Sequence, residues 1–255
     1  MGKIVKYLTI DLMKNWVMIV FTALLFLATL GFFALEGQNE KAVIGLLNLS
    51  LLLVPMLSLI FSITYYYNMY DFLLLILAQP IKRKKSIFSL YLSLLIVFSL
   101  SITIGLGLPL VLFNPFSTSY LLLLCILLLS AVFIAIALWA AVFTNDKSKG
   151  IGLSLLLWVY FVLLFDGILL LGMYNFADYP IEKYVLFFTF LNPVDLSRIM
   201  VLMQTQTAAL MGYSGAIFKQ FFTTQQGLGI AVLLLLSWVV VPLTFAFNKF
   251  KKKDL

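Results

Sequence analysis

Few side chains in this sequence could do chemistry. The chain has no histidine and a single cysteine, Cys125. That composition excludes a Cys/His zinc site, a Ser-His-Asp or Cys/His catalytic centre and an internal disulfide. No glycine-rich loop ends in Lys-Ser or Lys-Thr, so the chain has no phosphate loop for ATP. We therefore expect a non-catalytic chain with no cofactor of its own, and interpret Cys125 as a small buried apolar residue.

Asp166 is the one ionisable residue deep inside a long apolar stretch. A carboxylate near the middle of a bilayer costs about 3 kcal/mol, so it should face protein or water rather than lipid. Helical geometry places Gly152, Val159 and Met173 at seven-residue steps from it, and we hypothesise that this shared face lines a bundle interior or a subunit seam. Alternatively, Asp166 is protonated, or lies nearer the outer interface and bonds a backbone group.

Three methionines form the only candidate metal ligands. Met200 and Met203 are three residues apart, and Met211 follows two turns later. Thioethers are soft ligands suited to Cu(I). The alternative, which the spacing alone favours, is that they pad an apolar helix face.

The composition requires a membrane to position these residues. Apolar residues make up 64% of the chain and charged residues 11%, too few to cover a water-soluble fold. Six apolar stretches can each cross about 30 Å of hydrocarbon as a helix. The sequence predicts an all-α membrane protein with six transmembrane helices, near Trp16–Leu35, Ala42–Tyr67, Ser86–Phe113, Thr118–Phe143, Ile151–Met173 and Gly227–Phe247.

The basic residues predict the orientation. Of the 17 Lys and Arg residues, all but Lys41, Lys183, Arg198 and Lys219 lie in segments on one side of the predicted membrane. By the positive-inside rule, both termini face the cytoplasm, and we expect a multi-pass protein of a bacterial inner membrane. Because the cations flank spans and do not form a patch with aromatic partners, we expect no nucleic-acid partner.

Two segments are not explained by spanning. Residues 1–15 place apolar side chains among three lysines, which predicts a helix lying on the inner leaflet, separate from the six-helix domain of residues 16–255. Residues 174–226 form a long periplasmic segment. Its apolar run Tyr184–Leu191 is too short to cross, so it should lie at the outer surface or re-enter the membrane.

A helix start is predicted within that periplasmic segment. Asn192 can cap free N–H groups, Pro193 suits the first helical position, and Asp195 complements the positive helix end. Apolar residues then recur at helical spacing, which predicts an amphipathic helix at the outer surface. The residues on this face are Leu196, Ile199, Met200, Met203, Leu210 and Met211.

The loop at residues 68–85 resembles the cytoplasmic coupling element of ABC-2 type permeases. A leucine-rich stretch ends at Pro80 and four cations, Lys82 to Lys85, follow before the next span. The acidic-x-Gly-Thr that usually precedes the leucines is here Asn68-Met69-Tyr70-Asp71-Phe72. The resemblance implies docking on a separate ATPase that binds ATP and Mg, with coupling residues Asp71, Leu74, Leu77, Gln79, Pro80 and Arg83.

Residues 140–200 carry a narrower resemblance, to the NosY-type permeases of NosDFY systems, which mature nitrous oxide reductase for denitrification. It rests on Asn145–Gly150, a span containing Trp158, Phe165-Asp166 and Leu191–Arg198. It implies a homodimer, a NosF-type ATPase dimer, a periplasmic NosD-type β-helix partner, and copper or a sulfur species as cargo. The implied periplasmic contact residues are Asn192, Pro193, Asp195 and Arg198.

Other functions remain open at this point. The apolar interior suits a generic ABC-2 exporter of a lipid or hydrophobic small molecule equally well. A membrane scaffold is a further alternative, whereas an intramembrane hydrolase would need paired acids or metal ligands within the spans. Because a single ionisable residue lies inside them, we favour mechanical transmission over a wide hydrophilic ion path.

Overall fold

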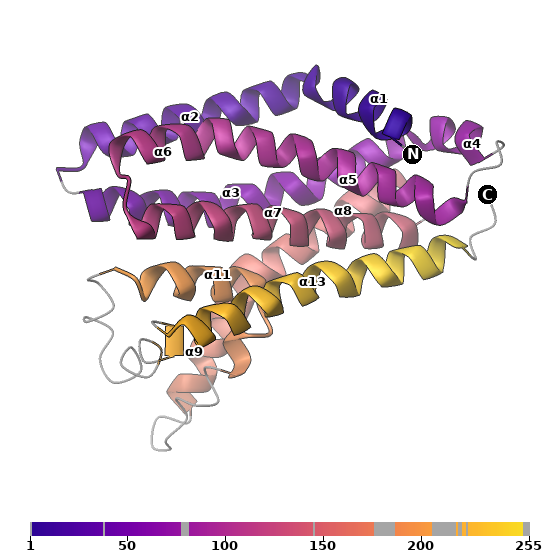
Figure 1. The fold of residues 1–255 in the computed structure, drawn as a ribbon. Coiled ribbons are helices and arrows are strands. Elements are labelled where there is room, and N and C mark those ends of the chain that lie inside the picture. Colours follow the sequence, from indigo (N-terminus) through magenta and orange to yellow (C-terminus); the bar gives the residue numbers. More distant parts are fainter. Residues whose placement is uncertain are drawn as a thin grey trace.

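Six long apolar helices make up the body of the chain in the computed structural model (Figure 1). The structure describes residues 2–37, 39–77, 82–144, 146–175, 187–205, 218, 221–222 and 224–251. No strand occurs in these ranges, and the prediction of an all-α fold with six spans is confirmed. The spans are α2 (Trp16–Leu35), α3 (Asn39–Asn68), α5–η1–α6 (Arg83–Phe113), α7 (Ser117–Phe143), α8–η2–α9 (Lys147–Asn175) and α13 (Gln225–Lys251).

Two of the six spans contain a π-helical segment. The third consists of α5 (Arg83–Ile102), η1 (Thr103–Gly107) and α6 (Leu108–Phe113). The fifth consists of α8 (Lys147–Val159), η2 (Tyr160–Leu164) and α9 (Phe165–Asn175). A π segment has an extra residue in its turn, so the faces before and after it are out of register.

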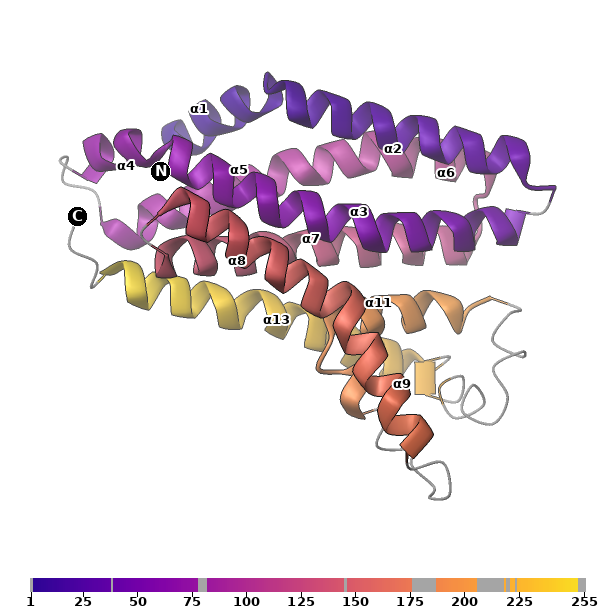
Figure 2. The same ribbon diagram turned by 180° about the vertical axis from the view of Figure 1, so that it is seen from behind.

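α7 is the central helix. It packs against α3, α13, α5 and α11, and 72% of its most apolar window is buried. Its side chains are apolar on every face, as expected for a helix surrounded by other helices. By contrast, only 11% of the corresponding window of α8–η2–α9 is buried, and this span diverges from the bundle towards α9 (Figure 2).

Side-chain caps fix where several helices begin. Asn15 accepts a hydrogen bond from the Val17 N–H at 3.0 Å and separates α1 (Gly2–Met13) from α2. Asp146 accepts one from the Ser148 N–H at 3.2 Å at the start of α8. Both side chains satisfy N–H groups that have no partner within the first helical turn.

The short helices α1 and α4 (Tyr70–Leu77) lie at one end of the bundle, together with the C-terminal end of α13 (Figure 1). The connection from α2 to α3 and that from α6 to α7 lie at the opposite end (Figures 1 and 2). Because α1 and the C-terminal end of α13 lie at the same end of the bundle, the chain crosses it an even number of times. The cytoplasmic location of the first end stays a prediction based on its lysines and arginines.

The helix α11 (Pro193–Leu202) re-enters the bundle. The Asn192 Nδ2 donates to the Phe161 carbonyl at 2.8 Å, and the Trp238 Nε1 donates to the Phe190 carbonyl at 3.4 Å. Phe161 and Trp238 lie midway along the fifth and sixth spans, so the chain around Phe190–Asn192 reaches their middle. This helix therefore packs within the bundle and does not lie over its surface, and the re-entrant alternative for the run Tyr184–Leu191 stays a prediction.

Packing explains this difference. Most side chains of α11 are buried against α7, α3 and α13, including polar ones that a surface helix would expose. The amphipathic pattern is real, but its polar face meets partners from the chain itself. The buried residues are Pro193, Val194, Asp195, Leu196, Ser197, Met200 and Val201.

Candidate functional site

The first part of the predicted coupling element forms a short helix, α4, at the lysine-rich end. A single residue, Met69, separates α4 from α3. Its carbonyl accepts a hydrogen bond from the Leu73 N–H at 2.9 Å. Leu73 and Ile76 face inward, whereas Asp71 and Leu75 are exposed. α4 thus has one face anchored to the bundle and another open to a partner.

The predicted coupling residues divide into those that the structure describes and those that it does not. Asp71 and Arg83 are exposed, and Leu74 is half-buried. Leu77 is the last residue of α4, and its side chain is not among those that the structure describes. Gln79 and Pro80 lie outside the described residues, so their contact with an ATPase stays a prediction.

α1 is bound to both α4 and α3. The rings of Tyr7 and Phe72 lie 5.3 Å apart, and the Tyr65 hydroxyl donates to Asp11 at 2.9 Å. Leu8 and Leu12 are fully buried beneath α1. A displacement of α4 would therefore be passed directly to the N-terminal helix.

The end of α3 is tied to the corner between α7 and α8. The Tyr67 hydroxyl and the Thr144 hydroxyl lie 2.7 Å apart, and the Lys147 Nζ donates to the Asn68 side chain at 2.8 Å. Tyr65 and Tyr67 are bonded links between helices, and Tyr66 is fully buried.

The third and sixth spans also meet at this end. The Arg83 Nη1 donates to the Lys251 carbonyl at 3.3 Å, and the rings of Phe88 and Phe247 lie 6.4 Å apart. The Lys249 ammonium lies 5.7 Å from the centre of the Phe143 ring. Contacts at this end thus join the third, fourth and sixth spans.

A second cluster lies where α11 meets the fifth span. The Arg198 Nη1 is 2.5 Å from an Asp166 carboxylate oxygen and 3.3 Å from one of Asp195. The Asn192 Nδ2 donates to Asp195 at 2.9 Å, and its Oδ1 accepts from the Val194 N–H at 3.0 Å. We call Asp166, Asn192, Asp195 and Arg198 the re-entrant cluster.

The burial of the re-entrant cluster decreases from Asn192 towards Asp166. Asn192 and Asp195 are buried, while the side chains of Arg198 and Asp166 are 28% and 32% exposed. One guanidinium serves two carboxylates, so the three charged groups sum to zero only when one carboxyl carries a proton. Such pairing is what allows a carboxylate to persist within a span.

The π segment interrupts the predicted face around Asp166, and a role of that face at a bundle interior or subunit seam stays a prediction. Gly152 is exposed, and the buried residues near the middle of this span are Phe161 and Val162, within η2. Seven-residue steps assume an uninterrupted α-helix, whereas η2 shifts the register between Gly152 and Asp166. Asp166 faces protein as expected, but its partner is Arg198 on α11.

The residues proposed for periplasmic contact lie mostly inside this chain. Asn192, Pro193 and Asp195 are buried in the bundle, and of the four only Arg198 is partly exposed. Their contact with a partner stays a prediction, and their observed contacts are internal. The pairing of Arg198 with Asp166 was missed, although the need of an intramembrane carboxylate for a cation was a usable signal.

Two of the three candidate methionines, and Cys125, are core residues in this structure. Met200 and Met203 are 0% and 1% exposed and belong to the apolar core, as does Cys125. This placement favours the packing interpretation of the two methionines, and copper binding by them stays untested. Met211 lies outside the described residues.

Comparison with known proteins agrees with this architecture. Residues 4–255 match a protein family described as "ABC-2 family transporter protein". No curated protein matches the chain.

Proposed function

The chain belongs to the ABC-2 transporter family and is a membrane permease subunit of an ABC transporter, and on this premise we propose that it transmits ATP-driven motion across the membrane. The cytoplasmic ATPase implied by the family would act on α4, and the re-entrant cluster would receive the motion. The observation that carries this proposal is the continuous packing from α4 through α3 and α7 to α11.

The transmission needs a bundle with two arrangements whose balance nucleotide can shift. Closure of the ATPase would displace α4, and α1 would follow through the Tyr7–Phe72 contact. The bonds of Tyr67 and Lys147 would carry the movement to the α7–α8 corner. Because α11 is held to the fifth span by ionic and amide contacts, it would move with that span.

The ATPase contact itself is proposed for the exposed part of the coupling loop. Asp71 offers a carboxylate on α4, and Arg83 a cation at the start of α5. In the same loop we propose that Leu74 and Leu77 supply apolar contacts to the ATPase. Gln79 and Pro80 are proposed to contact it from the turn that follows. The charge reversal Asp71→Lys should therefore weaken co-purification of the ATPase, while Glu36→Lys at the opposite end should not.

The cargo and outer partner are a finer part of the proposal. We propose a homodimer in a NosDFY-type complex that delivers copper, or a sulfur species, to nitrous oxide reductase. The support is the string Asn192-Pro193-Val194-Asp195, whose polar side chains hold the re-entrant cluster together. A NosD-type β-helix protein would dock on the outer segment, with Arg198 as the partly exposed one of the four implied contact residues.

The homodimer would use faces that one chain leaves uncovered. The fifth span is only 11% buried over its most apolar window, so most of it faces lipid or a second copy. Crosslinking single cysteines on this span in membranes should yield a dimer if the second copy packs there.

The test of the cargo is deletion of the gene in its host. If this proposal holds, nitrous oxide reductase from the deletion strain should lack copper, and expression of the chain should restore it. Arg198→Met should restore less copper than Asn175→Ala, a change at the exposed end of α9. Full copper loading in the deletion strain would refute the cargo while leaving the permease assignment intact.

A second candidate function is export of a lipid or hydrophobic small molecule. It is favoured by the bundle interior, where buried apolar side chains outnumber the buried polar ones among the described residues. Transport of a labelled lipid by the complex in proteoliposomes, with unchanged copper loading in cells, would favour this candidate.

A further inference from the structure

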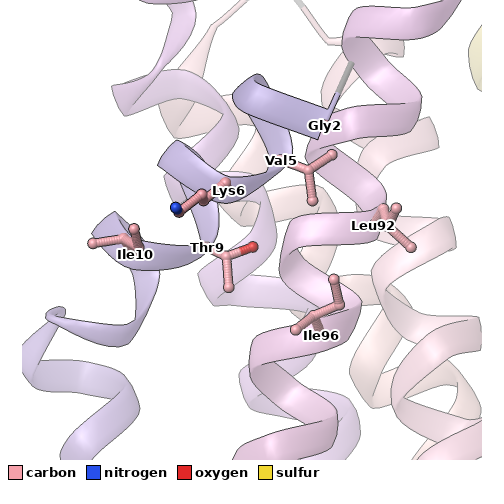
Figure 3. Close-up of a pocket in the computed structure, with 7 residues that line it drawn as sticks. All are labelled: Gly2, Val5, Lys6, Thr9, Ile10, Leu92 and Ile96. Carbon is pink, nitrogen blue, oxygen red and sulfur yellow. The ribbon is translucent and has the colours of Figure 1, made fainter.

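A groove runs between α1 and α5, apart from both clusters described above (Figure 3). Its volume is about 530 Å³, within the range of about 300–1,000 Å³ that is typical of small-molecule sites. Apart from Lys6 and Thr9, the residues on its walls are apolar or glycine. The lining residues are Gly2, Val5, Lys6, Thr9, Ile10, Leu92 and Ile96.

The length of the third span places this groove at a membrane boundary. Arg83–Phe113 has 31 residues, about 46 Å of helix, against about 30 Å of hydrocarbon. With Phe113 at one boundary, the start of α5 extends about 16 Å beyond the other. Leu92 and Ile96 lie about 14 and 20 Å from Arg83 along the helix, so the groove crosses this second boundary.

The charges around the groove are positive. Lys6 is exposed at its edge, and Lys3 and Lys14 are exposed on the same N-terminal segment. Among the residues that the structure describes, no carboxylate pairs with Lys6. Asp11, the carboxylate on α1, accepts from Tyr65 on α3.

From this geometry we propose that the groove binds an anionic phospholipid of the inner leaflet. One acyl chain lies between α1 and α5 against Leu92 and Ile96, and the phosphate pairs with Lys6. An apolar groove at the hydrocarbon boundary matches the chain, and an unpaired ammonium at its edge matches the headgroup. The lipid thereby holds α1, which contacts α4 through Tyr7, in place.

The test is native mass spectrometry of the full chain with dioleoyl phosphatidylglycerol or dioleoyl phosphatidylcholine. The wild type should retain the anionic lipid in roughly fivefold excess, the size expected for one lysine–headgroup attraction. Lys6→Gln should abolish this preference. Lys14→Gln makes the same charge change outside the groove and should preserve it. Ile96→Trp, which fills the groove, should lower retention of both lipids.

Three results would overturn the proposal. The first is equal retention of the two lipids by the wild type. The second is equal retention of the anionic lipid by Lys6→Gln and Lys14→Gln. The third is loss of the bound lipid when the ATPase binds, because this would assign the groove to a protein occupant. None of these results bears on the permease assignment, which rests on other residues.

Discussion

Arg198 joins two parts of the chain that are separated in sequence. Its guanidinium bonds Asp166 in the fifth span and Asp195 on α11, both with one Nη atom. The three side chains are buried or partly exposed, so water screens these charges only in part. Removing the cation leaves two carboxylates facing each other without compensation.

Arg198→Met is therefore expected to destabilise the folded chain. We expect a loss of about 2 kcal/mol, seen as a decrease in Tm of roughly 4–8 °C in detergent. Adding Asp166→Asn should recover most of the loss, because it removes one of the two unpaired charges. Lys84→Met is the control that removes a cation at an exposed site. An unchanged Tm for Arg198→Met would show that the ion pairs contribute nothing measurable.

Asn192 joins α11 to the π segment through its amide. It donates to the Phe161 carbonyl and to Asp195, and it accepts from the Val194 N–H. We expect Asn192→Ala to cost about 2–3 kcal/mol, because a helix cap is lost and buried polar groups lose partners. Thermal unfolding of Asn175→Ala, which loses an exposed bond to the Leu171 carbonyl, should stay near the wild type. Equal Tm values for the two variants would contradict the structural role of Asn192.

At the scale of elements, the close approach of α2 to η1 depends on a glycine. A Cβ at Gly105 would lie 2.8 Å from the Thr22 carbonyl oxygen and 2.9 Å from the Leu25 Cβ. A backbone atom cannot turn aside, so a side chain here would force the two helices apart. Gly152 is the matched case, because a Cβ there would meet no atom within 4 Å.

Gly105→Ala should accordingly lower stability by about 1–3 kcal/mol. Gly152→Ala should be neutral or stabilise by about 0.5–1 kcal/mol, because alanine favours the helix. Thermal unfolding of both variants in the same detergent measures the difference. If Gly105→Ala were as stable as Gly152→Ala, the packing of α2 on η1 would not be as tight as described.

The elements differ in how far their sequences predict them. The six spans follow from hydropathy, because lipid requires continuous apolar helices and leaves little choice. The cap at Asn192 and the start at Pro193 were also predictable from local chemistry. The burial of α11 was not, because its amphipathic pattern is the same whether its polar groups meet water or, as here, Asp166 and the Phe161 carbonyl of the fifth span.

The π segments were the second obstacle to prediction. No residue type in Tyr160–Leu164 or Thr103–Gly107 marks a π-helix, so helical steps were counted through them as if they were α-helical. Counting a π turn as an α turn changes a predicted burial pattern only slightly. It does change which neighbours a single residue such as Asp166 is expected to face. The step from Val159 to Asp166 crosses η2, whereas Gly152 and Val159 lie together in α8.

The two ends of the whole molecule differ: α1 and α4 lie at one end, and α11 lies in the other half (Figure 1). The lysine-rich end is predicted to be cytoplasmic. In a Cys125→Ser background, Lys84→Cys should react with a membrane-impermeant maleimide only after permeabilisation. Glu36→Cys should react in intact cells. Reaction of Lys84→Cys in intact cells would reverse the orientation and remove the proposed ATPase contact.

The central claim is that α4 and the re-entrant cluster belong to one coupled bundle. Affinity of the permease–ATPase complex for a non-hydrolysable ATP analogue tests it, because coupling between sites must appear as a shift in binding equilibrium. Arg198→Met should change this Kd by about fivefold or more, while Asn175→Ala should leave it unchanged. An unaltered Kd for Arg198→Met, with the ATPase bound at normal stoichiometry, would contradict the claim.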